Sequence, residues 1–316
     1  MKLYHFSFEL LSPSGSAWQS DTIFGHLCWQ VAYREGPAGV SKFLQPFLEG
    51  APPFVLSDAF PYGTLPAPLI PAVHTVSATI REYAEAKRKR KAKFLSVEQF
   101  VALCSKGGYD GFPPTVDWQA FDALHASIDR NTNRTGGEGS EGALFQTTSW
   151  LPVHRDIVSK FTPKLSLFVR ATERGLQSLL ELLESLSALG FGRDKSTGLG
   201  HFRFEPAQVR EAVELDDLKD ANGFVSLSSY VPAQSDPKEG FWKLRVKRGK
   251  LGEERSLGGN PFKKPIIQIE PGAVFHAPAG TKPFYGKMLK GVSPQYDDVV
   301  QCGYSVAVPC RLLVTN

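Results

Sequence analysis

The segment of residues 164–204 constrains the fold of this 316-residue chain more than any other part of the sequence. It opens with alternating apolar residues, and Thr172 can then cap an amphipathic helix that runs to about Leu189. A glycine-rich loop at residues 190–200 ends the helix, and an apolar alternation resumes after it. Strand, helix, loop and strand in this order predict one split βαβ unit.

The N-terminal residues predict a second unit of the same kind. Residues 3–10 alternate between apolar and polar side chains, as in a half-buried strand. Ser20 or Asp21 can cap a following amphipathic helix, which we expect to end near residues 35–37. The sequence therefore predicts an α+β protein of two ferredoxin-like (RRM-like) modules, with an inserted thumb hairpin and a glycine-rich loop.

An acidic stretch at residues 211–220 marks the expected boundary between the modules. Residues 1–220 would form the N-terminal module, with the thumb insertion near 127–148 and the glycine-rich loop at 190–200. Residues 221–316 would form a strand-rich second module. Within it we predict strands at residues 224–231, 241–248, 265–275 and 303–311.

Composition limits the class of protein. The formal net charge of +4 and the pI of about 8.8 permit an anionic partner without requiring one. The four cysteines form no CxxC pair and no zinc-finger spacing, so we expect reduced thiols and neither metal nor cofactor. The start of the sequence lacks signal-peptide features and no stretch of about 20 apolar residues occurs, so we expect a cytoplasmic protein without a membrane contact.

The glycine-rich loop carries the clearest binding chemistry. Glycines let the backbone approach a ligand, while two cations and two hydroxyls suit phosphate oxygens. An ordinary turn between helix and strand is the alternative. The candidate RNA-binding residues of this loop are Gly190, Gly192, Arg193, Lys195, Ser196, Thr197, Gly198 and Gly200.

Three further segments could contact RNA. The basic run at residues 87–93 lies in a predicted helix over 81–104, and a solvated helix face is its alternative. The predicted strand at 241–248 places cations on one face, which fits RNA or an acidic partner subunit. Its candidates are Lys243, Arg245 and Lys247, with Arg248 just beyond. The stem of the hairpin adds Arg130, Asn131 and Arg134.

Catalytic signals are sparse in this sequence. His5 and His26 could meet in space and act as acid and base in RNA cleavage, although isolated histidines are more often structural. No nucleophile-elbow, zinc-protease or paired-carboxylate signature occurs. We therefore expect a protein that is not an enzyme.

With these residues in hand, the chain resembles the RAMP superfamily of CRISPR proteins, because the loop at 190–200 follows a helix as in that superfamily. More narrowly, it is similar to the Csm subunit-four family, the crRNA 5′-tag-binding (Cas5-like) subunits of type III-A effector complexes. That resemblance spans nearly the whole chain. It rests on residues 20–29, 53–61, 127–130 and 303–304.

The resemblance implies a non-catalytic subunit that caps the crRNA 5′ end and holds its repeat-derived tag. Such a subunit would bridge the large polymerase-type Csm subunit to the backbone Csm subunit. Its thumb would distort the guide–target duplex and contact target RNA near the tag. Ser20 and Thr22 would offer a helix N-terminus to phosphate, and Asp21 would cap that helix.

Two other functions stay open on the sequence alone. A metal-independent repeat-RNA endoribonuclease of the same superfamily would use His5 or His26. A purely structural subunit would touch protein only, with the basic residues 243–250 docked on an acidic surface.

Overall fold

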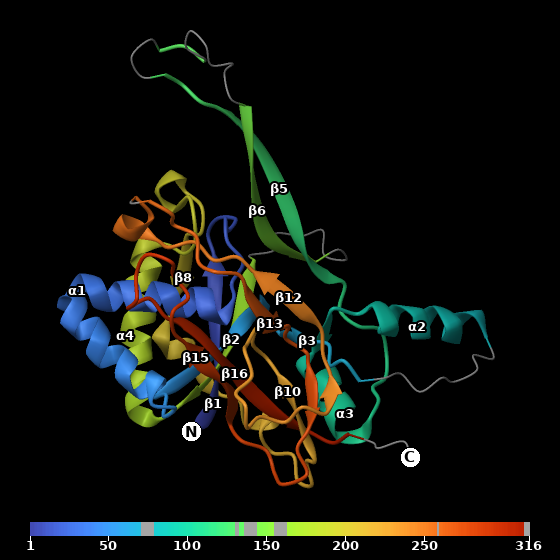
Figure 1. The fold of residues 1–316 in the computed structure, drawn as a ribbon. Coiled ribbons are helices and arrows are strands. Elements are labelled where there is room, and N and C mark those ends of the chain that lie inside the picture. Colours follow the sequence, from blue (N-terminus) through green and yellow to red (C-terminus); the bar gives the residue numbers. More distant parts are fainter. Residues whose placement is uncertain (71–78, 130–132, 136–143, 155–162, 258, 313–316) are drawn as a thin grey trace.

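The computed structural model describes all residues except 71–78, 130–132, 136–143, 155–162, 258 and 313–316 (Figure 1). Four α-helices occur among the described residues. They are α1 (Ser20–Leu48), α2 (Ile80–Lys91), α3 (Val97–Lys106) and α4 (Glu173–Leu189). Together with several β-sheets they make a mixed α and β architecture, as the sequence predicts.

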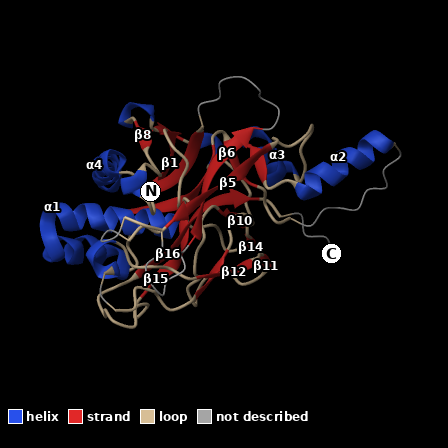
Figure 2. Ribbon diagram, turned by 90° about the horizontal axis from the view of Figure 1, so that it is seen from above, coloured by secondary structure: helices blue, strands red, loops and turns tan. Residues whose placement is uncertain are grey.

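The first sheet is built from the N-terminal two thirds of the chain. Its strands are β1 (Lys2–Leu10), β2 (Phe54–Pro61), β7 (Lys164–Ala171), β8 (Phe202–Phe204) and β9 (Arg210–Glu211). The order is β2-β7-β1-β8, every pairing is antiparallel, and β9 also pairs with β1. Helices α1 and α4 pack side by side over one face, where Phe6 and Phe8 of β1 are fully buried (Figures 1 and 2).

The second sheet comes from the C-terminal third. Its strands are β10 (Gly223–Ser226), β11 (Gly240–Phe241), β14 (Val274–His276), β15 (Phe284–Leu289) and β16 (Gln301–Cys310), in the order β11-β14-β10-β16-β15. Strand β16 contacts β2, and one continuous apolar core includes residues of both sheets. The two sheets therefore share a core.

Three two-stranded ribbons complete the fold. Strand β3 (Thr64–Pro66) pairs with β4 (Phe94–Ser96), and β12 (Leu244–Lys247) pairs with β13 (Ile266–Ile269). The longest ribbon joins β5 (Val116–Ala126) to β6 (Leu144–His154) through 11 paired positions. Figure 1 shows this hairpin projecting away from both sheets. Four 3₁₀ turns accompany these elements: η1 (Lys195–Thr197), η2 (Pro206–Gln208), η3 (Val213–Leu215) and η4 (Glu253–Ser256).

The sequence predicts the strand, helix and loop at residues 164–204 correctly, including Thr172 as the helix cap, whose hydroxyl accepts from the Gly175 amide at 3.0 Å. The first helical segment of α1 also ends where it is predicted to end, near residues 35–37, but a second segment that was not predicted follows it directly. Gly36 leaves helical geometry with φ of 68°, and Pro37 then starts a second helical segment that reaches Leu48. Proline is tolerated in the first turn of a helix, and Leu44 and Phe47 bury this segment in the core.

Other predicted elements divide into shorter pieces. The predicted helix over 81–104 is two helices, because a capping box between Ser96 and Gln99 starts α3 anew after β4. The predicted strand at 241–248 is split between β11 and β12, which belong to different sheets. The predicted strand at 265–275 divides into β13 and β14, with Gly272 at φ of 88° between them. Strand β15 has no counterpart among the predictions.

Two buried carboxylates connect the start of α1 to the C-terminal strands. The Asp21 side chain accepts hydrogen bonds from Lys247 and from Gln268 Nε2 at 2.9 Å, and from Gln301 Nε2. Asp58 of β2 accepts from the backbone amide of Ser20 at 2.9 Å and from that of Ser229 at 3.0 Å. The capping prediction for Ser20 and Asp21 is therefore wrong. The residue before the helix is Gln19, and a carboxylate from another strand serves the first turn.

Asp21 should contribute strongly to stability, because its removal leaves the Lys247 ammonium and two amide groups without their buried partner. We expect Asp21→Ala to lower the free energy of unfolding by roughly 3–5 kcal/mol. Urea unfolding followed by circular dichroism measures this change. Asp217→Ala, at an exposed carboxylate, is the matched control and should stay within about 0.5 kcal/mol of wild type. Equal effects of the two substitutions would contradict the role given to Asp21.

Candidate nucleic-acid interface

The glycine-rich loop begins where α4 ends. The Gly190 amide donates to Leu186 O at 2.9 Å, and Phe191 turns into the core. There the Phe191 ring stacks on Trp18 with 3.9 Å between ring centroids. The Phe191 amide donates to Gly200 O at 2.9 Å, so the two ends of the loop are joined. The loop is consequently held on a rigid base.

Two of the glycines are required by packing within the chain. Gly200 has φ of 70°, and a Cβ atom there would lie 1.8 Å from Phe191 O. Gly192 has φ of 84°, and a Cβ atom there would lie 2.8 Å from the Ser16 Cβ atom. Gly198 differs, because its φ is 99° but a Cβ atom would meet nothing within 4 Å. Only at Gly198 does the backbone face open space.

Most backbone amides of the loop are also used within the chain. Gly192 donates to His26 Nε2 at 3.0 Å, Arg193 to Ser16 Oγ at 3.1 Å, and Gly200 to Pro13 O at 2.8 Å. The loop is therefore anchored to α1 and to the segment after β1. What it offers to a ligand is mainly side chains, with Ser196, Thr197 and Arg193 exposed.

The two loop cations hold neighbouring elements. Arg193 Nη2 donates to Thr148 O of the β5–β6 hairpin at 2.7 Å, while half of its side chain remains exposed. Lys195 Nζ lies 2.7 Å from Glu253 Oε1 of η4. The Lys195 ammonium lowers the pKa of Glu253, so this carboxylate is ionised at neutral pH. Each cation is thus preplaced by a partner that a phosphate could replace.

The base of the hairpin lies against the same loop. Ser14 and Trp150 form a β-bridge in which each amide donates to the other's carbonyl at 2.9 Å. Together with the Arg193–Thr148 contact, this bridge makes the loop and the hairpin one connected surface. Exposed apolar and aromatic side chains continue along the hairpin, where Phe145 stacks on His125 with 5.2 Å between centroids.

The hairpin is longer than predicted. Its strands begin earlier, at Val116, and end later, at His154, than the predicted range of 127–148. Arg134 is exposed, and its carbonyl accepts from the Asp129 amide at 3.0 Å. The candidates Arg130 and Asn131 lie outside the described residues.

Several candidate residues lie in the interior instead. Ser20 is buried and donates to Ser229 O, while Thr22 Oγ1 accepts from Lys247 at 2.8 Å. Lys247 and Arg245 point toward Asp21 and Asp58, so the cationic face of this strand is turned inward. These four side chains already have hydrogen-bond or ion-pair partners within the chain, so an RNA strand would have to displace those contacts to reach them. Lys243 and Arg248 remain exposed.

The basic run of α2 lies far from the loop in Figure 1. Lys89 donates to Tyr109 O at 2.6 Å and pairs with Glu85, and Lys93 pairs with Asp117 at 2.9 Å. The Arg88 guanidinium lies 5.0 Å from the centroid of the Phe112 ring. Part of this run is thus used to fix the segment that follows α3.

His5 and His26 do not meet. His5 lies on the face of the first sheet where its ring contacts Phe168 and its Nε2 lies 2.8 Å from Ser166 Oγ. His26 lies on the opposite face, against Phe191. Burial, with smaller contributions from nearby cations, lowers the pKa of each histidine to about 4. Both are neutral at neutral pH, and neither has the other within reach as a proton partner.

Within the described part of the chain, no cluster of three or more histidine, cysteine or acidic side chains is arranged to hold a metal ion. No helix of that part is long and apolar enough to cross a membrane.

The contacts of the loop with Ser16, His26, Thr148 and Glu253 were not among the predictions. His26 and Gly192 are 166 positions apart, and Arg193 and Thr148 are 45 apart. No local pattern around any of these residues signals such a contact. These contacts depend on the tertiary structure, because the residues involved come together only after the first sheet has formed.

Comparison with known proteins finds a similarity to one CRISPR protein. No family model matches the sequence. It is 26% identical over 295 residues to the CRISPR system protein Csm4 of Streptococcus thermophilus, which covers 90% of this chain and 88% of that protein. The chain is similar to Csm4 along most of its length. The RAMP resemblance and its narrower form, drawn from the sequence, are confirmed by this match.

Solved structures share the fold of this chain. A chain in the crystal structure of a Csm1–Csm4 cassette in complex with cA4 has a TM-score of 0.62 and 17% identity, with 98% of this chain and 99% of that chain covered. A chain in the Csm3–Csm4 subcomplex of a type III-A CRISPR-Cas interference complex has a TM-score of 0.60 and 12% identity, with coverage of 98% and 99%. The mixed α and β fold of this chain therefore matches the fold of these two chains.

Two histidines, the buried His5 and the half-buried His26, should destabilise the folded chain in acid. Their pKa of about 4 in the folded chain lies below the ordinary value of 6.5, so the unfolded chain binds protons first as the pH falls. Their contribution is complete above pH 6.5 and is lost as the pH falls toward 4, at roughly 3 kcal/mol for each histidine. Urea unfolding at several pH values between 7.5 and 4.5 measures this loss.

Two variants separate the histidine effect from general acid unfolding. His26→Gln keeps an acceptor for the Gly192 amide but cannot titrate, so its stability should fall less steeply with pH than that of wild type. His125→Gln, on the exposed hairpin, should retain the wild-type steepness. If the free energy of unfolding of His26→Gln falls with pH as steeply as that of wild type, His26 does not titrate as described.

Proposed function

We propose that this chain is the Csm4-type, crRNA-binding subunit of a type III-A CRISPR effector complex. It would hold the repeat-derived tag at the crRNA 5′ end and contact target RNA near the tag. It would also join a large polymerase-type subunit to a backbone subunit. The relatives support this proposal through their names, since Csm4 occurs with Csm1 in one solved assembly and with Csm3 in another.

One observation carries the RNA-binding part of the proposal. The loop at residues 190–200 and the β5–β6 hairpin are joined by Arg193, whose guanidinium spans from one to the other. A single strand of RNA could therefore follow an unbroken path from loop to hairpin. Cations and hydroxyls suit its phosphates at the loop, and exposed aromatic rings suit its bases along the hairpin.

The architecture supports the finer fold assignment. We infer that β1, α1, β2, β7, α4 and β8 form a ferredoxin-like module, because their βαββαβ order and the sheet order β2-β7-β1-β8 match that motif. The β5–β6 hairpin is inserted between β2 and β7 of this module and takes the place of the expected thumb. The division of the chain at residues 220 and 221 remains a prediction.

Removing the loop cations should weaken RNA binding. We expect Arg193→Ala combined with Lys195→Ala to weaken binding of a 5′-tagged crRNA about tenfold or more at low salt. The slope of log affinity against log salt should fall by roughly one to two, because up to two phosphate contacts are lost. Fluorescence anisotropy at several salt concentrations, on the purified chain or its complex, measures both quantities.

Two further variants make the result specific to the loop. Lys219→Ala removes an exposed cation elsewhere and should leave the slope unchanged. Glu253→Gln removes the carboxylate that competes with phosphate for Lys195, so it should tighten RNA binding instead. An unchanged salt slope in the double variant would show that the loop does not hold the RNA backbone.

We further propose that the subunit does not cleave RNA. The histidines required by the endoribonuclease alternative lie on opposite faces of the first sheet and are neutral. A repeat RNA incubated with the protein in EDTA should stay intact on a denaturing gel. Cleavage that disappears in His5→Ala or His26→Ala would instead establish a processing enzyme.

A further inference from the structure

The β12–β13 ribbon has its polar and apolar faces reversed relative to an ordinary surface strand pair. Arg245, Lys247 and Gln268 point inward to the buried carboxylates. Val246 pairs with Ile267 on the outer side, and these side chains are 59% and 62% exposed. The aliphatic side chains of this ribbon therefore face solvent, while its charged side chains Arg245 and Lys247 face the interior.

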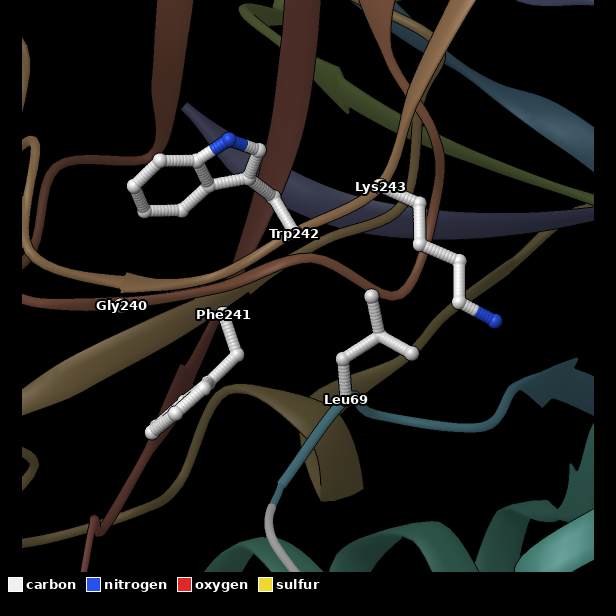
Figure 3. Close-up of a pocket in the computed structure, with 5 residues that line it drawn as sticks. All are labelled: Leu69, Gly240, Phe241, Trp242 and Lys243. Carbon is white, nitrogen blue, oxygen red and sulfur yellow. The ribbon is translucent and has the colours of Figure 1, made fainter.

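The exposed apolar surface extends beyond the ribbon. Leu244 is 59% exposed, and the chain before it lines a surface pocket of about 390 Å³. The lining residues are Leu69, Gly240, Phe241, Trp242 and Lys243. Figure 3 shows Leu69 between the Phe241 ring and the Lys243 amine in this view. Trp242 is held in place by stacking on Phe275, with 5.4 Å between centroids.

Neighbouring exposed hydrophobic residues of this kind mark an interaction site, whereas scattered single ones do not. A pocket beside an apolar face also suits an anchoring side chain, as at the centre of many protein interfaces. The surface thus has the two parts that a protein-binding site needs.

The charges around this face indicate the chemistry of the partner. Residues 242–250 contain five cations and no acidic residue, and Lys243, Arg248 and Lys250 among them are exposed. On this surface the exposed rings lie at the pocket, on Phe241 and Trp242, and one face of Trp242 is already stacked on Phe275. The centre of the face, at Val246 and Ile267, is aliphatic and gives RNA bases no ring to stack on and no hydrogen bond. An apolar protein surface with an acidic rim complements both the centre and the edge.

We propose that the outer face of the β12–β13 ribbon, with the adjoining pocket, is the docking surface for another protein subunit that presents an apolar patch rimmed by carboxylates. This inference rests on the proposed function, because it takes the partner from the same effector complex. It differs from the sequence-based hypothesis in its contact residues. Arg245 and Lys247 attach the ribbon to the rest of the chain, and Val246 and Ile267 contact the partner.

The test uses Val246→Glu combined with Ile267→Glu in the full chain. Both changes lie on the solvent side, and they oppose the partner by polarity and by charge. Binding to the large polymerase-type subunit and to the backbone subunit of the same organism is measured separately by co-purification and titration. We expect the variant to lose about tenfold or more in affinity for one of the two subunits and to retain the other.

Val213→Glu is the matched control, since Val213 is 56% exposed on η3 of the other module, and it should bind both subunits normally. Retention of both subunits by the double variant would overturn the proposal. So would a loss of crRNA binding with both subunits retained, which would make RNA the occupant. A wild-type chain that binds neither subunit nor crRNA would overturn the proposed function itself.

Discussion

The fold depends on two carboxylates buried where the N-terminal sheet meets the C-terminal strands. Asp58 serves the first turn of α1 and the Ser229 backbone, and Asp21 collects Lys247, Gln268 and Gln301. Buried charges of this kind are costly unless fully paired, so they specify one arrangement of the two sheets. On β7 a buried cation makes a comparable link, because the Arg170 guanidinium donates both to the exposed Asp216 carboxylate and to Ala307 O of the second sheet.

This use of charge explains the unusual character of the outer surface. On an ordinary surface strand the cations would face solvent. In the β12–β13 ribbon, Arg245 and Lys247 instead face the protein interior and pair with carboxylates there, so the ribbon presents aliphatic side chains to solvent. The loop between α4 and β8 places two further cations at the surface, where an anionic ligand could reach them. There, Arg193 contacts the Thr148 carbonyl and the Asp194 carboxylate, and Lys195 contacts the Glu253 carboxylate.

Local patterns were sufficient for much of the fold. Periodicity located β1, β7 and α4, and the glycines located the loop, because these features depend on neighbours in sequence. The direction of the cations at 245 and 247 could not be predicted. The alternation of residues along the strand shows that the two cations share a face, but it does not show which face is buried. That is decided by their carboxylate partners Asp58 and Asp21, which are more than 180 positions away in the sequence. The contacts of Ser20 and Thr22 could not be predicted for the same reason, because their partners Ser229 and Lys247 lie 209 and 225 positions away.

The β5–β6 hairpin has a consequence for how such proteins can diverge. It is fixed to the body near its base by the Ser14–Trp150 bridge, and its outer pairs are largely exposed. Inserting two residues into each strand would lengthen it by roughly 7 Å and keep every side chain on its original face, while inserting one would exchange the faces. The length of the hairpin can therefore change in steps of two residues per strand without altering the core.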